Sequence, residues 1–181
     1  LDGALDSLVR QDVDLAEEII GKDDIADEMD LNIENSCMRL LALQQPMSKD
    51  LRTIATALKV ITDLERIGDY ASDIAQLVKT LALEPYHKPL EDIPRLASMA
   101  TAMIRDAVQS FVDHDTDLAI KVCEDDDVVD DLYDKVFGDA ISSIKETPDA
   151  ARQLALLILA ARRLERVADH ATNVAESVYY M

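Results

Sequence analysis

Residues 63–69 read DLERIGD, and a hundred residues later residues 163–169 read RLERVAD. Each copy places a glutamate and an aspartate four positions apart, as Glu65 with Asp69 and as Glu165 with Asp169. On an α-helix this spacing brings both carboxylates to one face, one turn apart. Because the pattern Leu-Glu-Arg-x-x-Asp recurs at a single offset, it indicates a duplicated helical unit.

The duplication extends over most of the chain. Two further aspartate pairs, again four residues apart, recur at an offset of 103: Asp23 with Asp27, and Asp126 with Asp130. Between these blocks Pro46 recurs as Pro148, at an offset of 102. An offset that changes only at the turns is expected of whole helices joined by loops of variable length.

Composition narrows the class of protein. With four glycines, no tryptophan and 49% apolar residues, the 181-residue chain favours an all-α protein with a substantial core. A formal net charge of −19 argues against nucleic acid or an anionic membrane as a direct ligand, and suits cations or basic partner surfaces. Cys37 and Cys123 are not equivalent in the repeat, so we expect free thiols in a cytoplasmic protein. The sequence has no apolar run long enough to suggest membrane insertion.

Prolines and helical periodicity predict two three-helix antiparallel units with short connections. We expect the first unit at residues 1–83, a proline-rich linker at 84–91 and the second unit at 92–181. The predicted helices cover about 1–11, 14–44, 50–81, 92–112, 116–144 and 148–181. The second unit's first helix starts near Asp92, and its counterpart would start about ten residues before Leu1. We therefore expect the first helix to be truncated at its N-terminus.

The acidic pairs lie at matched levels in the two predicted hairpins. In each unit, both pairs lie about 20 residues from the proline turn, which is roughly 30 Å along a helix. The acids also continue stripes of large apolar residues, whereas solvated acids normally lie opposite such stripes. We therefore predict two oxygen-lined metal clusters, one of Asp23, Asp27, Glu65 and Asp69 and the other of Asp126, Asp130, Glu165 and Asp169.

Carboxylates gathered at one level require compensation, because two unit charges at ~4 Å repel by ~4 kcal/mol at an effective dielectric near 20. Either some of them are protonated or a cation binds. Ligation by oxygen alone suits Mg²⁺, Mn²⁺, Fe³⁺ or Ca²⁺, with Zn²⁺ also possible. The alternative is a solvated acidic face, or acids near helix N-termini that interact with the helix dipole. Asp73 and its counterpart Asn173 are either peripheral ligands or polar surface.

The two motifs, Gln45-Pro46 followed by Asp50-Leu51-Arg52, and the Asp-x-x-x-Asp pairs resemble the PhoU family of phosphate-signalling regulators over essentially the whole chain. The resemblance implies two three-helix bundles related by a pseudo-twofold axis, with metal clusters on the acidic motifs that hold iron or zinc, or else manganese or magnesium. It also implies a cytoplasmic homodimer that negatively regulates the phosphate regulon. Such a protein links the ATPase of the phosphate ABC transporter to a sensor histidine kinase. Two departures from the family pattern stand out. The N-terminal part of the first helix is missing, and the second motif carries Ala168 where many members have glycine and Asn173 where an acid would strengthen the second metal site.

Two other functions compete with a metal-binding regulator. A carboxylate-bridged di-iron oxidase uses Glu-x-x-His, but the residues three positions after the two motif glutamates are Gly68 and Ala168. This lack of a nitrogen ligand predicts that the protein is not an enzyme. A structural helical scaffold with a solvated acidic surface and no metal is the remaining alternative.

Overall fold

The computed structural model describes residues 1–181, and every regular element is a helix, which confirms the all-α prediction. Prolines lie in the α3–α4 turn, the α6–α7 turn and the linker between the units, and Gly21 lies at the α2–α3 break. In chain order the elements are α1 (Asp2–Arg10), α2 (Val13–Ile20), α3 (Asp23–Gln44), α4 (Lys49–Leu81), α5 (Asp92–Asp113), α6 (Thr116–Glu146), the 3-10 helix η1 (Pro148–Ala150) and α7 (Ala151–Val178).

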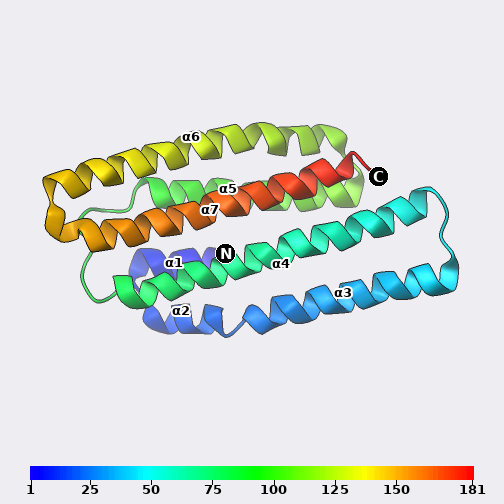
Figure 1. Ribbon diagram of the computed structural model, residues 1–181, viewed down its shortest axis with the longest axis horizontal. Coiled ribbons are helices and arrows are strands. Elements are labelled where there is room, and N and C mark those ends of the chain that lie inside the picture. Colours follow the sequence, from blue (N-terminus) through cyan, green and yellow to red (C-terminus); the bar gives the residue numbers. More distant parts are fainter.

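The helices form two antiparallel bundles that meet along α4 and α7 (Figure 1). In what we call the first unit, α1, α2 and α3 pack against α4. In the second unit, α5, α6 and α7 pack against one another. The two central helices run in opposite directions. Because α4 and α7 contact each other, the two motif copies lie near the boundary between the units.

The second helix of the first unit is not continuous, and the prediction of a single helix to Gln44 is wrong at Gly21 and Lys22. The structure ends α2 at Ile20 and begins α3 at Asp23. Glycine loses more conformational freedom in a helix than any other residue, which favours a break at this point. The break lies immediately before Asp23, so it sets how the acidic start of α3 is presented to α4.

Proline positions agree with the predicted turns. The α3–α4 turn contains Pro46, and its neighbours Gln45 and Ser48 both have positive φ. The α6–α7 turn contains Pro148 at the start of η1. Both turns lie at the far end of their hairpins from the following linker or C-terminus (Figure 1). Each acidic motif therefore lies well inside a long helix.

The linker between the units contacts both of them. The Tyr86 hydroxyl donates to the backbone oxygen of Leu8 in the first unit, at 2.5 Å. Lys88 Nζ donates to Ser143 Oγ in the second unit, at 2.9 Å. One apolar core then continues from unit to unit, through side chains such as Leu8, Ile74, Leu96, Met103 and Leu164. Burying these side chains fixes the two central helices on which the acidic motifs lie.

Two further features bear on the sequence predictions. Cys37 and Cys123 are free thiols. None of the helices combines the length and the apolar character that crossing a bilayer requires.

Candidate metal centres

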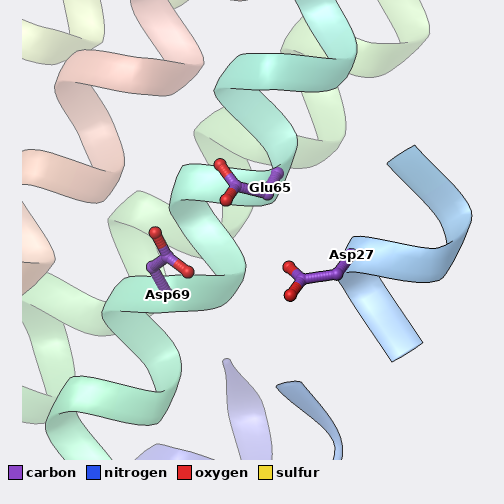
Figure 2. A group of neighbouring side chains, drawn as sticks. All are labelled: Asp27, Glu65 and Asp69. Carbon is purple, nitrogen blue, oxygen red and sulfur yellow. The ribbon is translucent and has the colours of Figure 1, made fainter. Parts of the chain in front are cut away.

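The first acidic site lies between α3 and α4. Figure 2 shows Asp27 on α3 facing Glu65 and Asp69, which lie one turn apart on α4. One carboxylate oxygen from each residue lies within 4.8 Å of the others. Asp27 is exposed and the two α4 acids are half-buried. Three converging oxygens from two helices form a partial coordination sphere for a hard cation.

Asp23, predicted in the same cluster, lies outside this group of three. Its Oδ1 accepts a hydrogen bond from the Ser72 hydroxyl of α4, at 2.8 Å. The bond directs this carboxylate toward the next turn of α4 beyond Asp69. Three of the four predicted acids of the first unit are therefore brought together, and the fourth joins the two helices by a hydrogen bond.

The charges of the first site are partly compensated by one arginine. Arg66 Nη1 lies 2.8 Å from Asp69 Oδ2, and Arg66 Nε lies 3.5 Å from Glu65 Oε2. Burial raises the pKa of Glu65, and the nearby Asp69 carboxylate adds to this rise while Arg66 opposes it. The site thus holds more negative charge than its arginine offsets, and a bound cation would relieve the excess.

Asp30 is a further acidic neighbour of this site, outside the predicted ligand set. It is half-buried, its Oδ1 is enclosed without a hydrogen-bond partner, and its charge contributes to the raised pKa of Glu65. Its counterpart in the repeat is Tyr133, so the duplication gave no signal for it. Spacing on α3 offered one: Asp30 lies three residues after Asp27, which is almost one helical turn.

The second acidic site lies between α6 and α7. Burial raises the pKa of Asp126, and the charges of Asp130 and Asp169 raise it further. Burial and then the charge of Asp169 also raise the pKa of Asp130 and of Glu165. The four predicted acids are therefore neighbours, although no three of their oxygens approach as closely as those of the first site. The second cluster is looser than the first.

The acids of the second site are also more deeply buried. Burial, followed by the charge of Asp130, raises the pKa of Asp126 to about 6, and a contact with Thr172 opposes part of this rise. Burial is likewise the first cause of the raised pKa of Glu165, which Arg162 partly counteracts. Oxygens Asp126 Oδ1 and Glu165 Oε2 are enclosed without a hydrogen-bond partner. Buried carboxylate oxygens without donors are a donor set that fits a hard cation.

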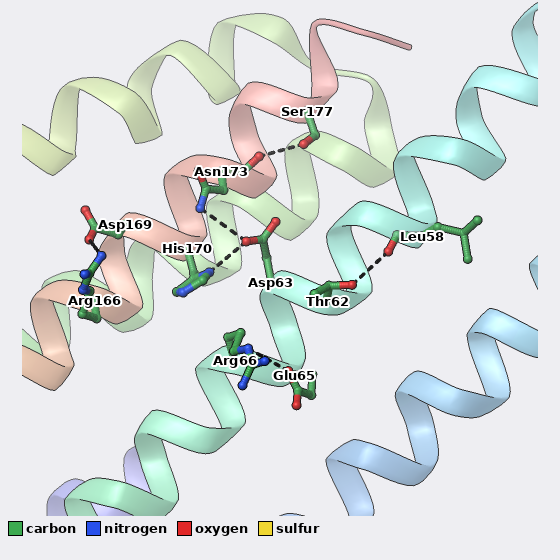
Figure 3. Close-up of polar contacts among 10 residues, drawn as sticks. All are labelled: Leu58, Thr62, Asp63, Glu65, Arg66, Arg166, Asp169, His170, Asn173 and Ser177. Atoms are coloured by element: carbon green, nitrogen blue, oxygen red, sulfur yellow. Dashed lines mark hydrogen bonds and ion pairs between the residues drawn. The ribbon is translucent and has the colours of Figure 1, made fainter.

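Arginines flank the second site as they flank the first. Arg162 donates to Glu165 Oε1, and Arg166 Nη1 lies 3.2 Å from Asp169 Oδ2 (Figure 3). Arg66 and Arg166 are repeat counterparts and pair with the corresponding aspartate in each unit. Each motif therefore supplies its own partly compensating cation on the same helix.

The two candidate peripheral ligands have other partners. Asp73 Oδ2 lies 2.8 Å from Arg163 Nε, which joins α4 to α7. Asn173 Nδ2 donates to Asp63 Oδ1 at 3.3 Å, and His170 Nδ1 lies 2.8 Å from the same oxygen (Figure 3). Asp73 and Asn173 therefore hold the two units together. This role follows from their position at the unit boundary, which repeat spacing alone does not reveal.

These boundary contacts follow the pseudo-twofold relation between the units. Asp63 pairs with Asn173, and their repeat counterparts Arg163 and Asp73 pair with each other. At the centre, the ring of Tyr70 lies 5.6 Å from the ring of its counterpart, His170. The two acidic sites are thus placed on either side of one symmetric junction.

Comparisons with known proteins agree with this architecture. The family model described as "PhoU domain" matches residues 1–78 and again residues 93–178. A phosphate-specific transport system accessory protein PhoU homolog from Clostridium acetobutylicum is 40% identical over 178 residues, 98% of this chain and 81% of the relative. The Aquifex aeolicus protein of the same name is 42% identical over 166 residues, 92% of this chain and 75% of the relative.

Solved structures match over nearly the whole chain. The crystal structure of PhoU from Pseudomonas aeruginosa superimposes with a TM-score of 0.94 at 35% identity. That match covers 99% of this chain and 86% of the solved chain. The chain therefore belongs to the PhoU family.

Proposed function

We propose that this protein is a metal-binding regulator of phosphate uptake and phosphate-starvation signalling. Its relatives are named phosphate-specific transport system accessory proteins, and their sequences extend over nearly all of this chain. On the family pattern, it acts in the cytoplasm as a homodimer and a negative regulator. It then transmits the state of the phosphate ABC transporter, through the transporter's ATPase, to the sensor histidine kinase, and performs no catalysis of its own.

The observation that carries the metal proposal is the convergence of Asp27, Glu65 and Asp69, whose oxygens lie within 4.8 Å of one another across two helices. In the second unit, the support is the pair of enclosed oxygens on Asp126 and Glu165 that have no donor. Asp23, Asp130 and Asp169 complete the two predicted ligand sets. Iron, manganese, magnesium or zinc are the candidate ions, since each accepts carboxylate oxygens.

A cation at either site would supply positive charge and connect two helices of a bundle. Repulsion between the acids exists only when the helices are packed, so metal binding favours the folded state. Arg66 and Arg166 would then keep the carboxylates oriented from the open side. A regulator built in this way couples metal occupancy to the rigidity of the surfaces that its partners contact.

A scaffold without metal is the second candidate function. It is favoured by the exposure of Asp27 and by the arginines that already pair with Asp69 and Asp169. In that case the acidic surface would recognise basic partner surfaces directly.

Metal analysis distinguishes the two functions. Protein purified without chelator should contain carboxylate-bound metal, and Glu65→Ala with Asp69→Ala should retain about half of it because one of two sites is lost. The matched pair Glu165→Ala with Asp169→Ala should also retain about half. Glu146→Ala with Asp149→Ala, an exposed acidic pair at the α6–α7 turn, should retain all of it. Metal content unchanged in both motif variants would support the scaffold.

Thermal unfolding provides the second measurement. Chelation should lower the melting temperature of the parent, and readdition of a hard ion should restore it. At a hundredfold excess over Kd, the bound ion should raise the free energy of unfolding by about 3 kcal/mol. Pull-down of the transporter ATPase and of the kinase domain by parent and variants tests the regulatory role separately. If neither protein is retained by metal-loaded parent, the proposed link between transporter and kinase is wrong.

A further inference from the structure

A cavity of about 430 Å³ opens beside the α6–α7 turn, where the linker enters α5. We call it the turn cavity. Its floor is apolar, because Ile93 of α5 and Leu154 and Leu157 of α7 line it and are buried against the core. A concave site of this size with an apolar floor and a few polar groups is typical of a place where another molecule binds.

The turn cavity exists because α6 and α7 extend beyond the start of α5. Lys135 Nζ lies 2.8 Å from Oδ2 of Asp92, the first residue of α5. Residues 136–146 of α6 therefore project beyond α5 by roughly 16 Å, and the linker crosses this part of the hairpin. The two ends of the chain lie elsewhere: Asp2 pairs with Arg105 in the middle of α5, and the C-terminus is at the other end of the second bundle (Figure 1).

The linker forms one wall of the turn cavity and is held in place by two side chains. Gln153 Oε1 accepts a hydrogen bond from the His87 N–H at 2.8 Å, and Gln153 Nε2 donates to the Pro85 oxygen at 3.0 Å. Lys88 Nζ donates to the hydroxyl of the buried Ser143 at 2.9 Å. The wall is thus fixed before anything binds, which lowers the ordering cost of binding.

The charges around the turn cavity indicate what kind of molecule fits. Four acids line it against a single base, Lys88: Glu91, Asp92, Asp139 and Glu146. Asp92 already pairs with Lys135, whereas the other three acids form no ion pair within the chain. Lys88 is held on the linker side, so the α6 side presents uncompensated carboxylates. The cavity therefore repels anions and is complementary to a positively charged ligand.

Spacing along α6 gives the form of that ligand. Val136, Ala140 and Ser143 are four and three residues apart and face the cavity. Asp139 and Glu146 are seven residues apart, close to two turns, so they lie on one edge of this face at a separation of roughly 10 Å. A helix lying along α6 matches them with two bases that are also seven residues apart. An apolar residue between those bases would enter the cavity.

We propose that the turn cavity docks a basic amphipathic helix of a partner protein. Its apolar anchor packs on Leu154 and Leu157, and its two bases pair with Asp139 and Glu146. The docked helix continues the layer that α5 forms over α6 and α7, and it uses the helix-in-groove mode of recognition. The proposal goes beyond the regulatory role by assigning a surface and a partner chemistry, and it does not depend on metal at either acidic site.

The first test uses a fluorescein-labelled, alanine-rich helical peptide of about 18 residues. It carries two lysines seven positions apart and a leucine four positions after the first. The parent should bind it in fluorescence anisotropy, and replacement of the leucine by alanine should weaken binding roughly tenfold, because the anchor is lost. Replacement of both lysines by glutamate should abolish binding. A parent that binds the lysine and glutamate peptides equally, or ignores the loss of leucine, would overturn the proposal.

The location is read from methyl NMR. Addition of the lysine peptide should shift the methyl signals of Leu154 and Leu157, which form the floor of the turn cavity. Leu118, near the start of α6 at the opposite end of the second bundle, gives the reference signal and should not shift. Unchanged signals from Leu154 and Leu157 would place the peptide elsewhere and overturn the proposal.

A matched pair of charge variants tests the rim. Asp139→Asn with Glu146→Gln should weaken binding of the lysine peptide roughly tenfold, since both ion pairs are lost. Glu124→Gln with Asp131→Asn removes two other exposed acids, also seven residues apart on α6, and should bind as the parent does. Equal losses in the two variants would show that only net charge matters, which would overturn the proposal. Metal content, measured on the same proteins, tests the metal sites separately.

Discussion

In the first unit the glutamate of the repeated motif, Glu65, keeps 24% of its side chain exposed, whereas its counterpart Glu165 in the second unit keeps 9%. The Glu, Arg and Asp of the motif are the same in both units, so the difference in exposure comes from the helices around them. In the second unit the unbroken 31-residue α6 packs along α7, whereas in the first unit α2 and α3 pack against α4 as two helices separated at Gly21 and Lys22. Repeat spacing thus places the oxygens, and the packing of the facing helix determines how deeply they are buried.

This difference has an electrostatic consequence. In the open first site, three oxygens converge and solvent screens their repulsion. In the second site, burial penalises the ionised acids and raises the pKa of Asp126 to about 6. A cation would therefore relieve more desolvation in the second unit, and protons would compete with it more strongly there.

The largest expected difference in stability between repeat-equivalent variants is at the junction between the units. Asp63→Ala should lower the free energy of unfolding by about 1–3 kcal/mol, because His170 and Asn173 lose their shared buried acceptor. Its repeat counterpart gives the matched variant: Arg163→Ala removes an ion pair that is 40% exposed on both sides and should cost under about 1 kcal/mol. Urea unfolding of the metal-free proteins measures both. Equal losses would show that burial of Asp63 is not what distinguishes the two positions.

A smaller effect is expected from pH. The pKa of Asp126 rises from its ordinary value of 3.8 to about 6 in the folded state, so the folded state binds the proton more tightly. The contribution of Asp126 to the free energy of unfolding is therefore favourable below pH 4 and is lost as the pH rises toward 6. The shift sets an upper limit of about 3 kcal/mol, and partial solvent screening reduces this to about 1–2 kcal/mol.

The measurement compares metal-free parent with Asp126→Asn between pH 7 and pH 4. The stability difference between the two proteins should shrink as the pH falls, since the parent regains what ionisation of Asp126 costs. A constant difference between parent and Asp126→Asn would contradict the raised pKa.

Sequence was sufficient for the architecture because its signals are local. Proline cannot continue the interior of a helix, so Pro46 and Pro148 end the helices that precede them. The apolar periodicity indicates that the segments between the turns are α-helices. The break between α2 and α3 was missed because Gly21 has Glu124 as its counterpart, in the middle of the unbroken α6. A helix-propensity difference of about 1 kcal/mol at one glycine does not by itself decide whether a helix continues.

Within the candidate sites, residue spacing along one helix predicted which acids lie together better than matched positions on two different helices did. Glu65 and Asp69 must share a face of α4, because the period of the helix fixes it. The roles of Asp23 and Asp30 depend instead on how α3 is rotated about its own axis. That rotation is set by the Gly21–Lys22 break and by the hydrogen bond from Ser72, and neither is visible in the acidic pattern.

The smallest expected effect on stability tests how closely α3 approaches α4 at the first site. A methyl group at Gly68 would lie 3.2 Å from the Ala26 Cβ, so Gly68→Ala requires α3 to move by a few tenths of an ångström. The gain in helix propensity, about 1 kcal/mol, offsets this crowding, and the free energy of unfolding should change by less than that amount. Metal binding should respond more, because Asp27 directly follows Ala26 and Asp69 directly follows Gly68.

We therefore expect Gly68→Ala to weaken binding at the first site roughly three- to tenfold, which is about 1 kcal/mol, while the second site binds as in the parent. The reverse exchange, Ala168→Gly, is the control in the second unit. Ala168 is fully buried, so this change should cost about 1–2 kcal/mol in helix propensity and lost packing. Site-resolved metal titration and urea unfolding of both variants measure these effects. If Gly68→Ala binds metal as tightly as the parent, α3 has enough freedom to readjust around Ala26, and the spacing of the two helices does not control the first site.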